Sequence, residues 1–248
     1  MFVEIMEEMI KTRNLYKSFG NNEVLKDVNL TVKKGESVVI LGKSGIGKSV
    51  LAKCIVGLLK HDKGTIEIFN KDITTLDEDE MDKIRKKMGY LFQGGALYDS
   101  MSVRENLEFP LLRSRFAGDE GGNINDRVEE VLENVGLLDA QNKMPSELSG
   151  GMKKRVGLAR TLILQPEIIF YDEPTTGLDP VTSKEISNLM VEIQEKYNTT
   201  SLIITHDLKC AKTTANQIKL LKDGNFYAEG SYDELENSSD EVVRKYFS

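Results

Sequence analysis

Apolar residues alternate with polar ones or form short runs near both ends of the chain, and recur with a wider, helix-like spacing between. Alternation predicts strands at residues 10–15 and 65–69, short apolar runs predict strands at residues 36–41 and 88–92, and a further strand is expected at residues 24–32. A second set of strands is expected at residues 167–171, 201–205, 218–222 and 226–229. Residues 16–22 are polar and are expected to form a loop between the first two strands, with turn chemistry at Asn21 and Asn22.

Helices are expected where the spacing widens, at residues 50–56, 77–87, 127–135, 152–164 and 181–197. Asp126 is expected to cap the third of these, and Gly136 to end it. Residues 113–125 precede that cap and are expected to form a polar loop. Residues 233–248 are expected to hold one short helix and a charged end.

This order of elements predicts an α/β fold with a mainly parallel sheet, an N-terminal antiparallel β portion and an inserted helical subdomain. We expect a single domain at residues 10–230, with its core at residues 10–93 and 166–230 and its helical subdomain at residues 94–165. Residues 1–9 are expected to be a short extension and residues 231–248 a tail.

The amino-acid composition excludes some kinds of binding partner and indicates the cellular compartment. The 33 basic and 40 acidic residues give a net charge of −7, which argues against nucleic acid as the main partner. No apolar run approaches the roughly 20 residues that cross a bilayer. Cys54 and Cys210 are expected to be free, buried thiols of a cytoplasmic protein. His61 and His206 are too few for a histidine-rich metal site.

A glycine-rich turn with the spacing of a nucleotide phosphate cradle lies between the third predicted strand and the first helix. Its residues are Gly42, Lys43, Ser44, Gly45, Ile46, Gly47, Lys48 and Ser49. Glycines let backbone N–H groups turn inward at a helix N-terminus, where they bind anions. Lys48 is expected to reach the β- and γ-phosphates of a bound nucleotide, and Ser49 to bind Mg²⁺. A turn that binds nothing is the alternative, which the strand–turn–helix context disfavours.

Other polar residues directly follow predicted strands. In parallel sheets, ligands bind at the carboxyl ends of the strands. Asp172 is suited to hold Mg²⁺, and Glu173 to polarise a water for attack on the γ-phosphorus. His206 could contact the γ-phosphate or serve packing alone, and Gln93 could bridge metal and water. Phe19 could stack on an adenine or be a packing residue.

A second anion site is indicated before the helix at residues 152–164. Ser149, Gly150, Gly151 and Met152 place a serine and free N–H groups at a helix N-terminus. Two phosphate sites in one chain suggest that the second completes another subunit's pocket. A capped helix without a ligand is the alternative.

Together these motifs resemble the set found in ABC-type ATPases of the P-loop NTPase class, over residues 10–230. The glycine turn resembles the Walker A loop, residues 168–172 the Walker B strand, and Ser149 to Met152 the family signature. By resemblance Gln93 is the Q-loop glutamine, Glu173 the catalytic glutamate and His206 the switch histidine. Phe19 falls at the adenine-stacking position, and Asp179 lies in the D-loop.

The resemblance implies a head-to-tail homodimer that encloses two ATP with Mg²⁺, with Ser149 to Met152 and Asp179 completing the partner's site. It also implies a separate membrane permease that docks at the surface from Gly94 to Glu105. The chain would then be cytoplasmic and peripheral on the inner face of the cell membrane. Lys43, Met152 and Gly177 depart from the common family residues, and Gly177 lies in the D-loop.

A narrower resemblance is to Mla-type lipid-transport ATPases, carried by residues 92–100, 102–110, 148–160 and 239–247. It implies phospholipid transport with a permease, an Mce-domain substrate-binding protein and a small regulatory subunit. Another cargo, such as lipoproteins or amino acids, is the first alternative. A soluble ABC-type ATPase without a permease, acting in cofactor assembly or on ribosomes, is the second.

Overall fold

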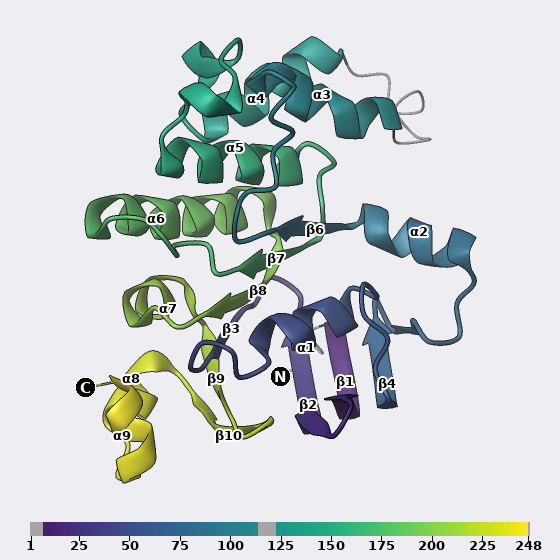
Figure 1. Ribbon diagram of the computed structural model, residues 1–248, viewed down its shortest axis with the longest axis vertical. Coiled ribbons are helices and arrows are strands. Elements are labelled where there is room, and N and C mark those ends of the chain that lie inside the picture. Colours follow the sequence, from purple (N-terminus) through teal and green to yellow (C-terminus); the bar gives the residue numbers. More distant parts are fainter. Residues whose placement is uncertain (1–6, 114–122, 248) are drawn as a thin grey trace, which may run out of the picture.

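The computed structural model describes residues 7–113 and 123–247, which form two sheets with helices packed against them (Figure 1). The larger sheet consists of β3 (Ser37–Leu41), β6 (Met88–Leu91), β7 (Ile168–Asp172), β8 (Thr200–Thr205), β9 (Gln217–Lys222) and β10 (Asn225–Gly230). Its strand order is β10-β9-β3-β8-β7-β6, and every pair is parallel except β9 with β10. The mainly parallel sheet expected from the sequence is therefore confirmed.

The smaller sheet is the antiparallel portion expected near the N-terminus. It consists of β1 (Glu8–Phe19), β2 (Asn22–Lys33), β4 (Lys63–Ile68) and β5 (Lys71–Asp72), in the order β2-β1-β4-β5. The predicted loop at residues 16–22 was wrong, because β1 continues to Phe19 and turns at Gly20 and Asn21. Several register shifts along β1 break the period of two, and this concealed the strand's second half.

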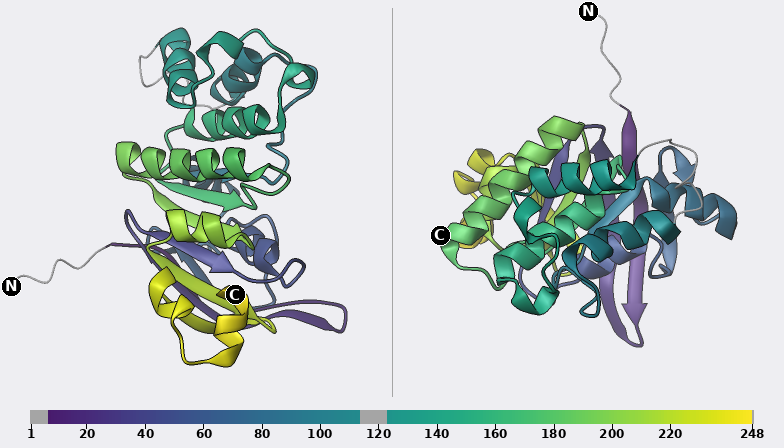
Figure 2. Two further views of the ribbon diagram at one scale, coloured as in Figure 1. Left: turned by 90° about the vertical axis from the view of Figure 1, so that its left-hand side faces the viewer. Right: turned by 90° about the horizontal axis from the view of Figure 1, so that it is seen from above.

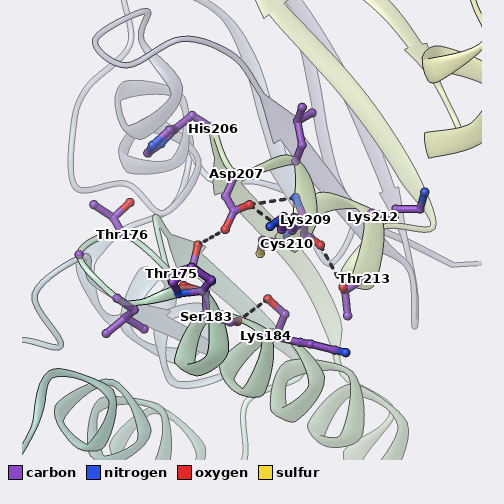
Figure 3. A pocket seen from close by; sticks show the side chains of 15 residues that line it. Thr175, Thr176, Ser183, Lys184, His206, Asp207, Lys209, Cys210, Lys212 and Thr213 are labelled. Carbon is purple, nitrogen blue, oxygen red and sulfur yellow. Dashed lines mark hydrogen bonds between the residues drawn. The ribbon is translucent and has the colours of Figure 1, made fainter. Parts of the chain in front are cut away.

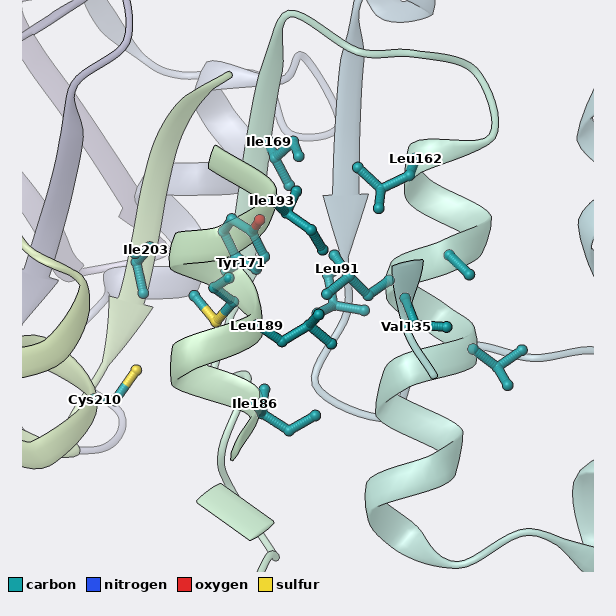
Figure 4. Close-up of a cluster of buried hydrophobic side chains, with 14 of the residues drawn as sticks. Leu91, Val135, Leu162, Ile169, Tyr171, Ile186, Leu189, Ile193, Ile203 and Cys210 are labelled. Atoms are coloured by element: carbon teal, nitrogen blue, oxygen red, sulfur yellow. The ribbon is translucent and has the colours of Figure 1, made fainter. Parts of the chain in front are cut away.

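The larger sheet is buried on both faces, and alternate residues of its strands point into two different cores. One core contains Val39, Leu41, Ile169, Tyr171 and Ile203. There the sheet packs against α5 (Gly150–Leu162), α6 (Pro180–Tyr197) and α7 (Leu208–Thr214) (Figure 4). The other core contains Val38, Ile40, Phe170, Leu202 and Ile204, with α1 (Lys48–Ile55) and the smaller sheet. This double burial explains the continuous apolar runs in β3, β7 and β8.

The inserted helices lie together at one end of the molecule, shown in teal in Figure 2. They are α3 (Val103–Arg113), α4 (Ile124–Asn134), the short 3-10 turns at Leu138–Ala140 and Pro145–Glu147, and α5. The predicted cap at Asp126 was wrong: Asn123 caps α4 three residues earlier and accepts a hydrogen bond from the Asn125 N–H at 3.0 Å. Residues 114–122 of the predicted loop lie outside the described residues.

The remaining helices are α2 (Glu78–Lys86), α8 (Tyr232–Glu236) and α9 (Glu241–Phe247). Asp77 caps α2 within a capping box, close to where the sequence placed this helix. The tail forms two short helices rather than the single one expected. Leu235 and Val243 of these helices are buried in the same core as α6 and α7. Within residues 7–113 and 123–247, no helix has both the length and the apolar character needed to span a bilayer.

Both cysteines are free and buried, as expected from the sequence. Burial raises the pKa of the Cys54 thiol and of the Cys210 thiol to about 11. At pH 8 the thiolate fraction is then on the order of 100-fold smaller than for an exposed cysteine. We expect iodoacetamide at pH 8 to label the native protein at least about 100-fold more slowly than the urea-unfolded chain, measured by mass spectrometry. Similar labelling rates in the two states would contradict this burial.

Candidate nucleotide and catalytic site

The glycine-rich turn connects β3 to α1 at the carboxyl edge of the larger sheet, as the sequence predicted. Gly47 directly precedes α1 with φ at +113°, a conformation that side-chain-bearing residues rarely adopt. A Cβ at this position would also lie 2.6 Å from Cγ1 of Val24 on β2. The turn therefore requires glycine here for both its backbone angle and the close approach of β2.

Lys48 is buried, with 4% of its side chain exposed. Its Nζ donates hydrogen bonds to the carbonyl oxygens of Gly42 at 2.8 Å and Lys43 at 3.0 Å. The same ammonium lies 3.2 Å from Oε1 of Glu173. The cation is thus held inside the turn, beside the carboxylate that follows β7.

Ser49 and Asp172 form the adjoining part of the site. The Ser49 hydroxyl donates to Oδ1 of Asp172 at 2.7 Å, and the Tyr90 hydroxyl donates to Oδ2 at 3.0 Å. Burial and the Asp172 charge raise the pKa of Tyr90, so Tyr90 stays a donor at neutral pH. A hydroxyl and a carboxylate side by side are oxygen ligands of the kind Mg²⁺ prefers, so these residues fit the ion.

Glu173 is the centre of the arrangement. Its Oε2 accepts a hydrogen bond from the Thr176 hydroxyl at 3.1 Å and lies 2.8 Å from Nδ1 of His206. Its backbone has φ at +51°, and its N–H donates to the Ile204 carbonyl at 2.8 Å. The structure therefore brings together Lys48, Glu173 and His206, which lie far apart in the sequence.

His206 also borders a cavity of about 810 Å³ between α6 and α7 (Figure 3). Next to it, Asp207 caps α7 through the Lys209 N–H and accepts a hydrogen bond from the Thr175 hydroxyl at 2.9 Å. This bond ties the segment after β8 to the segment after β7, on which Glu173 lies. Tyr90, Thr175, Thr176 and Asp207 were not predicted as site residues, although each lies within three residues of one that was.

The predicted signature and D-loop residues lie apart from this cluster. Ser149 caps α5 by accepting from the Met152 N–H at 3.2 Å, and Asp179 caps α6 through the Val181 and Thr182 N–H groups. Bonds from Thr182, first through its side chain, hold the pKa of Asp179 below its usual value. Among the described residues, no hydrogen bond or ion pair joins Ser149 or Asp179 to the Lys48–Glu173 pair.

The other predicted site residues are largely exposed. Phe19 lies at the β1–β2 turn, 49% exposed, with Nζ of Lys17 at 5.3 Å from its ring centroid. Gln93 is exposed, and its main-chain carbonyl, rather than its side chain, is bonded to a buried lysine. The Lys43 side chain is also exposed. Gly177 has φ at +83°, which explains glycine at this point of the D-loop.

The sequence pattern of the ABC transporter family matches residues 25–176 of the chain. Mkl of Mycobacterium tuberculosis (strain ATCC 25618 / H37Rv), named a probable ribonucleotide transport ATP-binding protein, is 41% identical over 239 residues, covering 96% of this chain and 66% of Mkl. The methionine import ATP-binding protein MetN of Clostridioides difficile (strain 630) is 35% identical over 237 residues, covering 96% of this chain and 73% of MetN. The chain thus spans about two thirds of the length of its Mkl relative.

Solved structures give the same assignment. The chain superposes with a TM-score of 0.84 on cbiO1 of Clostridium perfringens, part of the ABC transporter complex cbiONQ, at 32% identity, covering 96% of this chain and 94% of cbiO1. It superposes with a TM-score of 0.79 on the dimeric ATP-binding cassette MJ0796 bound to ADP and Pi, at 36% identity, covering 90% of this chain and 99% of that one. From the family match and these relatives, the chain belongs to the ABC transporter family, as an ATP-binding subunit that takes ATP with Mg²⁺ and hydrolyses the ATP.

Proposed function

We propose that this chain powers a separate membrane permease by hydrolysing ATP between two copies of itself. The contact of Glu173 with both Lys48 and His206 is the observation that carries this proposal. Glu173 accepts a proton from the water that attacks the γ-phosphorus, and His206 holds the Glu173 carboxylate in place. Lys48 exchanges the loop carbonyls for the β- and γ-phosphates. Ser49 and Asp172, with Gln93, would hold Mg²⁺, which neutralises phosphate charge.

The position of Ser149 to Met152 supports a head-to-tail dimer. These residues place main-chain N–H groups and the Ser149 hydroxyl at the start of α5, and among the described residues none is bonded to the Lys48–Glu173 pair. A helix N-terminus binds phosphate oxygens through such groups. In a head-to-tail pair, Ser149 and Asp179 of one copy meet the phosphate loop of the other. The MJ0796 cassette is dimeric, which favours a dimer of this chain as well.

The surface from Gly94 to Glu105 is the proposed docking site for the permease. Asn106 is fully buried beneath it and bonds the Tyr98 N–H and carbonyl and the Met101 and Ser102 carbonyls. Tyr98 remains 44% exposed, with its ring edge-on to Phe109 at 4.9 Å between centroids. A firmly held segment that presents an exposed aromatic side chain suits a protein interface. The chain would then be peripheral on the cytoplasmic face of the cell membrane.

For the cargo we propose phospholipid, with an Mce-domain protein and a small regulatory subunit as further partners. The support is the resemblance of residues 92–110 and 148–160 to Mla-type ATPases. The names of the Mkl and MetN relatives favour a second candidate, transport of a small polar solute. A soluble ATPase without a permease remains the third candidate.

Reconstitution with a permease identified by co-purification with this chain separates the three candidates. We expect ATP-dependent movement of a fluorescent phospholipid between vesicles, and none with the Glu173→Gln variant. Stimulation of ATP hydrolysis by methionine or ribonucleotides, without lipid movement, would replace lipid by a small solute as cargo. Failure of the chain to pellet with membranes that contain the permease would favour the soluble ATPase.

A further inference from the structure

A buried lysine outside the assigned site contacts two of its segments. Lys154 lies in the second turn of α5 and is 5% exposed. Its Nζ donates hydrogen bonds to the Gln93 carbonyl and, at 3.2 Å, to the Glu173 carbonyl. Within the described part of the chain, no carboxylate lies within ion-pair distance of this ammonium. The ammonium instead bonds two main-chain oxygens, whose positions it restrains.

Burial of an ammonium group is costly, and an apolar side chain would fill this space without that cost. Desolvation lowers the pKa of Lys154, and the nearby Asp172 and Glu173 charges act in the opposite direction. We therefore expect Lys154 to matter because it fixes the two carbonyl oxygens that it bonds, and not because its apolar stem is buried. Those atoms belong to the ends of β6 and β7.

The Glu173 backbone is held from two sides in an uncommon conformation. Its φ of +51° lies in the left-handed region, which glutamate rarely adopts. Its N–H is bonded to Ile204 of β8, and its carbonyl is bonded to Lys154 of α5. These two bonds aim the carboxylate at Lys48 and His206. Without Lys154, the Glu173 carbonyl keeps only the longer bond from the Thr176 N–H, at 3.3 Å.

Lys154 is also five residues beyond Ser149, the cap of α5. The side chain therefore connects α5, the helix that Ser149 begins, to the Glu173 carbonyl and to the carbonyl of Gln93, which precedes the Gly94–Glu105 surface. In the proposed dimer, Glu173 acts at the chain's own phosphate loop, and Ser149 acts at the partner's loop. Lys154 thus lies between the two nucleotide sites.

We propose that Lys154 is a positioning residue that aims Glu173 for hydrolysis and links the two nucleotide sites of the dimer. The aiming of Glu173 depends only on contacts within one chain. The link between sites rests on the proposed head-to-tail dimer.

The test compares Lys154→Met with Lys153→Met and Lys154→Arg. Lys153 undergoes the same chemical change one residue earlier, where the side chain is only partly buried, so this variant controls for loss of a lysine from α5. Lys154→Arg keeps a charged donor. For Lys154→Met we expect kcat to fall about 10- to 100-fold, as small misplacements of catalytic groups do, with KM for ATP within about threefold. Lys154→Arg should recover most of the loss, and Lys153→Met should match the wild type.

Hydrogen exchange and the Hill coefficient for ATP distinguish the positioning role of Lys154 from its role in linking the two sites. Hydrogen exchange of the ligand-free protein should rise in the peptide that covers residues 172–176 for Lys154→Met alone, at equal melting temperature. The Hill coefficient for ATP should fall towards 1 in this variant. A kcat within twofold of Lys153→Met, or a loss that tracks the unfolded fraction, would overturn the positioning role. A wild-type Hill coefficient of 1 would instead count against the proposed dimer and the link, while leaving the aiming role to the exchange and kcat data.

Discussion

Replacing Glu173 with Gln is expected to lower the rate of ATP hydrolysis by about 10²- to 10⁴-fold, the usual contribution of a general base. The amide has nearly the same shape as the carboxylate but cannot accept the water's proton. ATP should still bind, because Lys48 and the glycine-rich turn are unchanged. The variant should therefore accumulate as an ATP-bound dimer, which gel filtration with and without ATP measures alongside phosphate release.

Glu167→Gln is the matched control for this variant. Glu167 precedes the same strand, β7, at its opposite end, and its exposed carboxylate pairs with Lys87 at 2.7 Å. Its change removes the same charge far from the phosphate loop, and hydrolysis should stay within about twofold of the wild type. Undiminished hydrolysis in Glu173→Gln would show that another group takes the proton.

Replacing Lys48 with Met is expected to weaken ATP binding by about 100-fold or more. Hydrogen bonds to charged groups contribute about 1.5–3 kcal/mol each, and each 1.4 kcal/mol changes a dissociation constant about tenfold. The variant also leaves the buried Glu173 carboxylate without its cation at 3.2 Å, so the protein should become less stable. Titration with a fluorescent ATP analogue, at a temperature where melting curves show the variant folded, measures the binding loss alone.

Lys43→Met provides the comparison within the same turn. The Lys43 side chain is exposed, and the structure gives no reason for lysine at this position. ATP affinity should therefore change by less than about threefold. An equal loss of affinity in both variants would mean that charge near the turn, rather than the buried position of Lys48, holds the phosphates.

The parts of the fold predicted from the sequence are those that depend on local pattern. β7 and β8 were recognisable because burial on both faces leaves them continuously apolar, and α2 because Asp77 begins a capping box. The second half of β1 was not recognisable, since its bulges depend on pairing with β2 and β4. At α4, both Asn123 and Asp126 are suitable caps, and the sequence alone does not decide between them.

The same distinction applies to the site. Lys48 and Ser49 belong to one contiguous motif, so eight residues sufficed to predict them. Tyr90 reaches Asp172 only because β6 pairs with β7 in the register that sets Tyr90 opposite Phe170. Lys154 reaches Glu173 only because α5 packs beside the ends of β6 and β7. Such contacts are set by tertiary structure, which a local pattern does not contain.

The strand order of the larger sheet also determines when, during synthesis of the chain, the phosphate-binding turn can form. β3, which precedes the glycine-rich turn, is flanked by β8 and β9, whose residues follow it by about 160 positions or more. Contacts between such distant segments form late and slowly. While the ribosome is still making the inserted helices, β3 has neither neighbour and the turn lacks Glu173. A growing chain therefore gains its phosphate-binding turn only after β9 has emerged, and an incomplete chain is not expected to hold ATP.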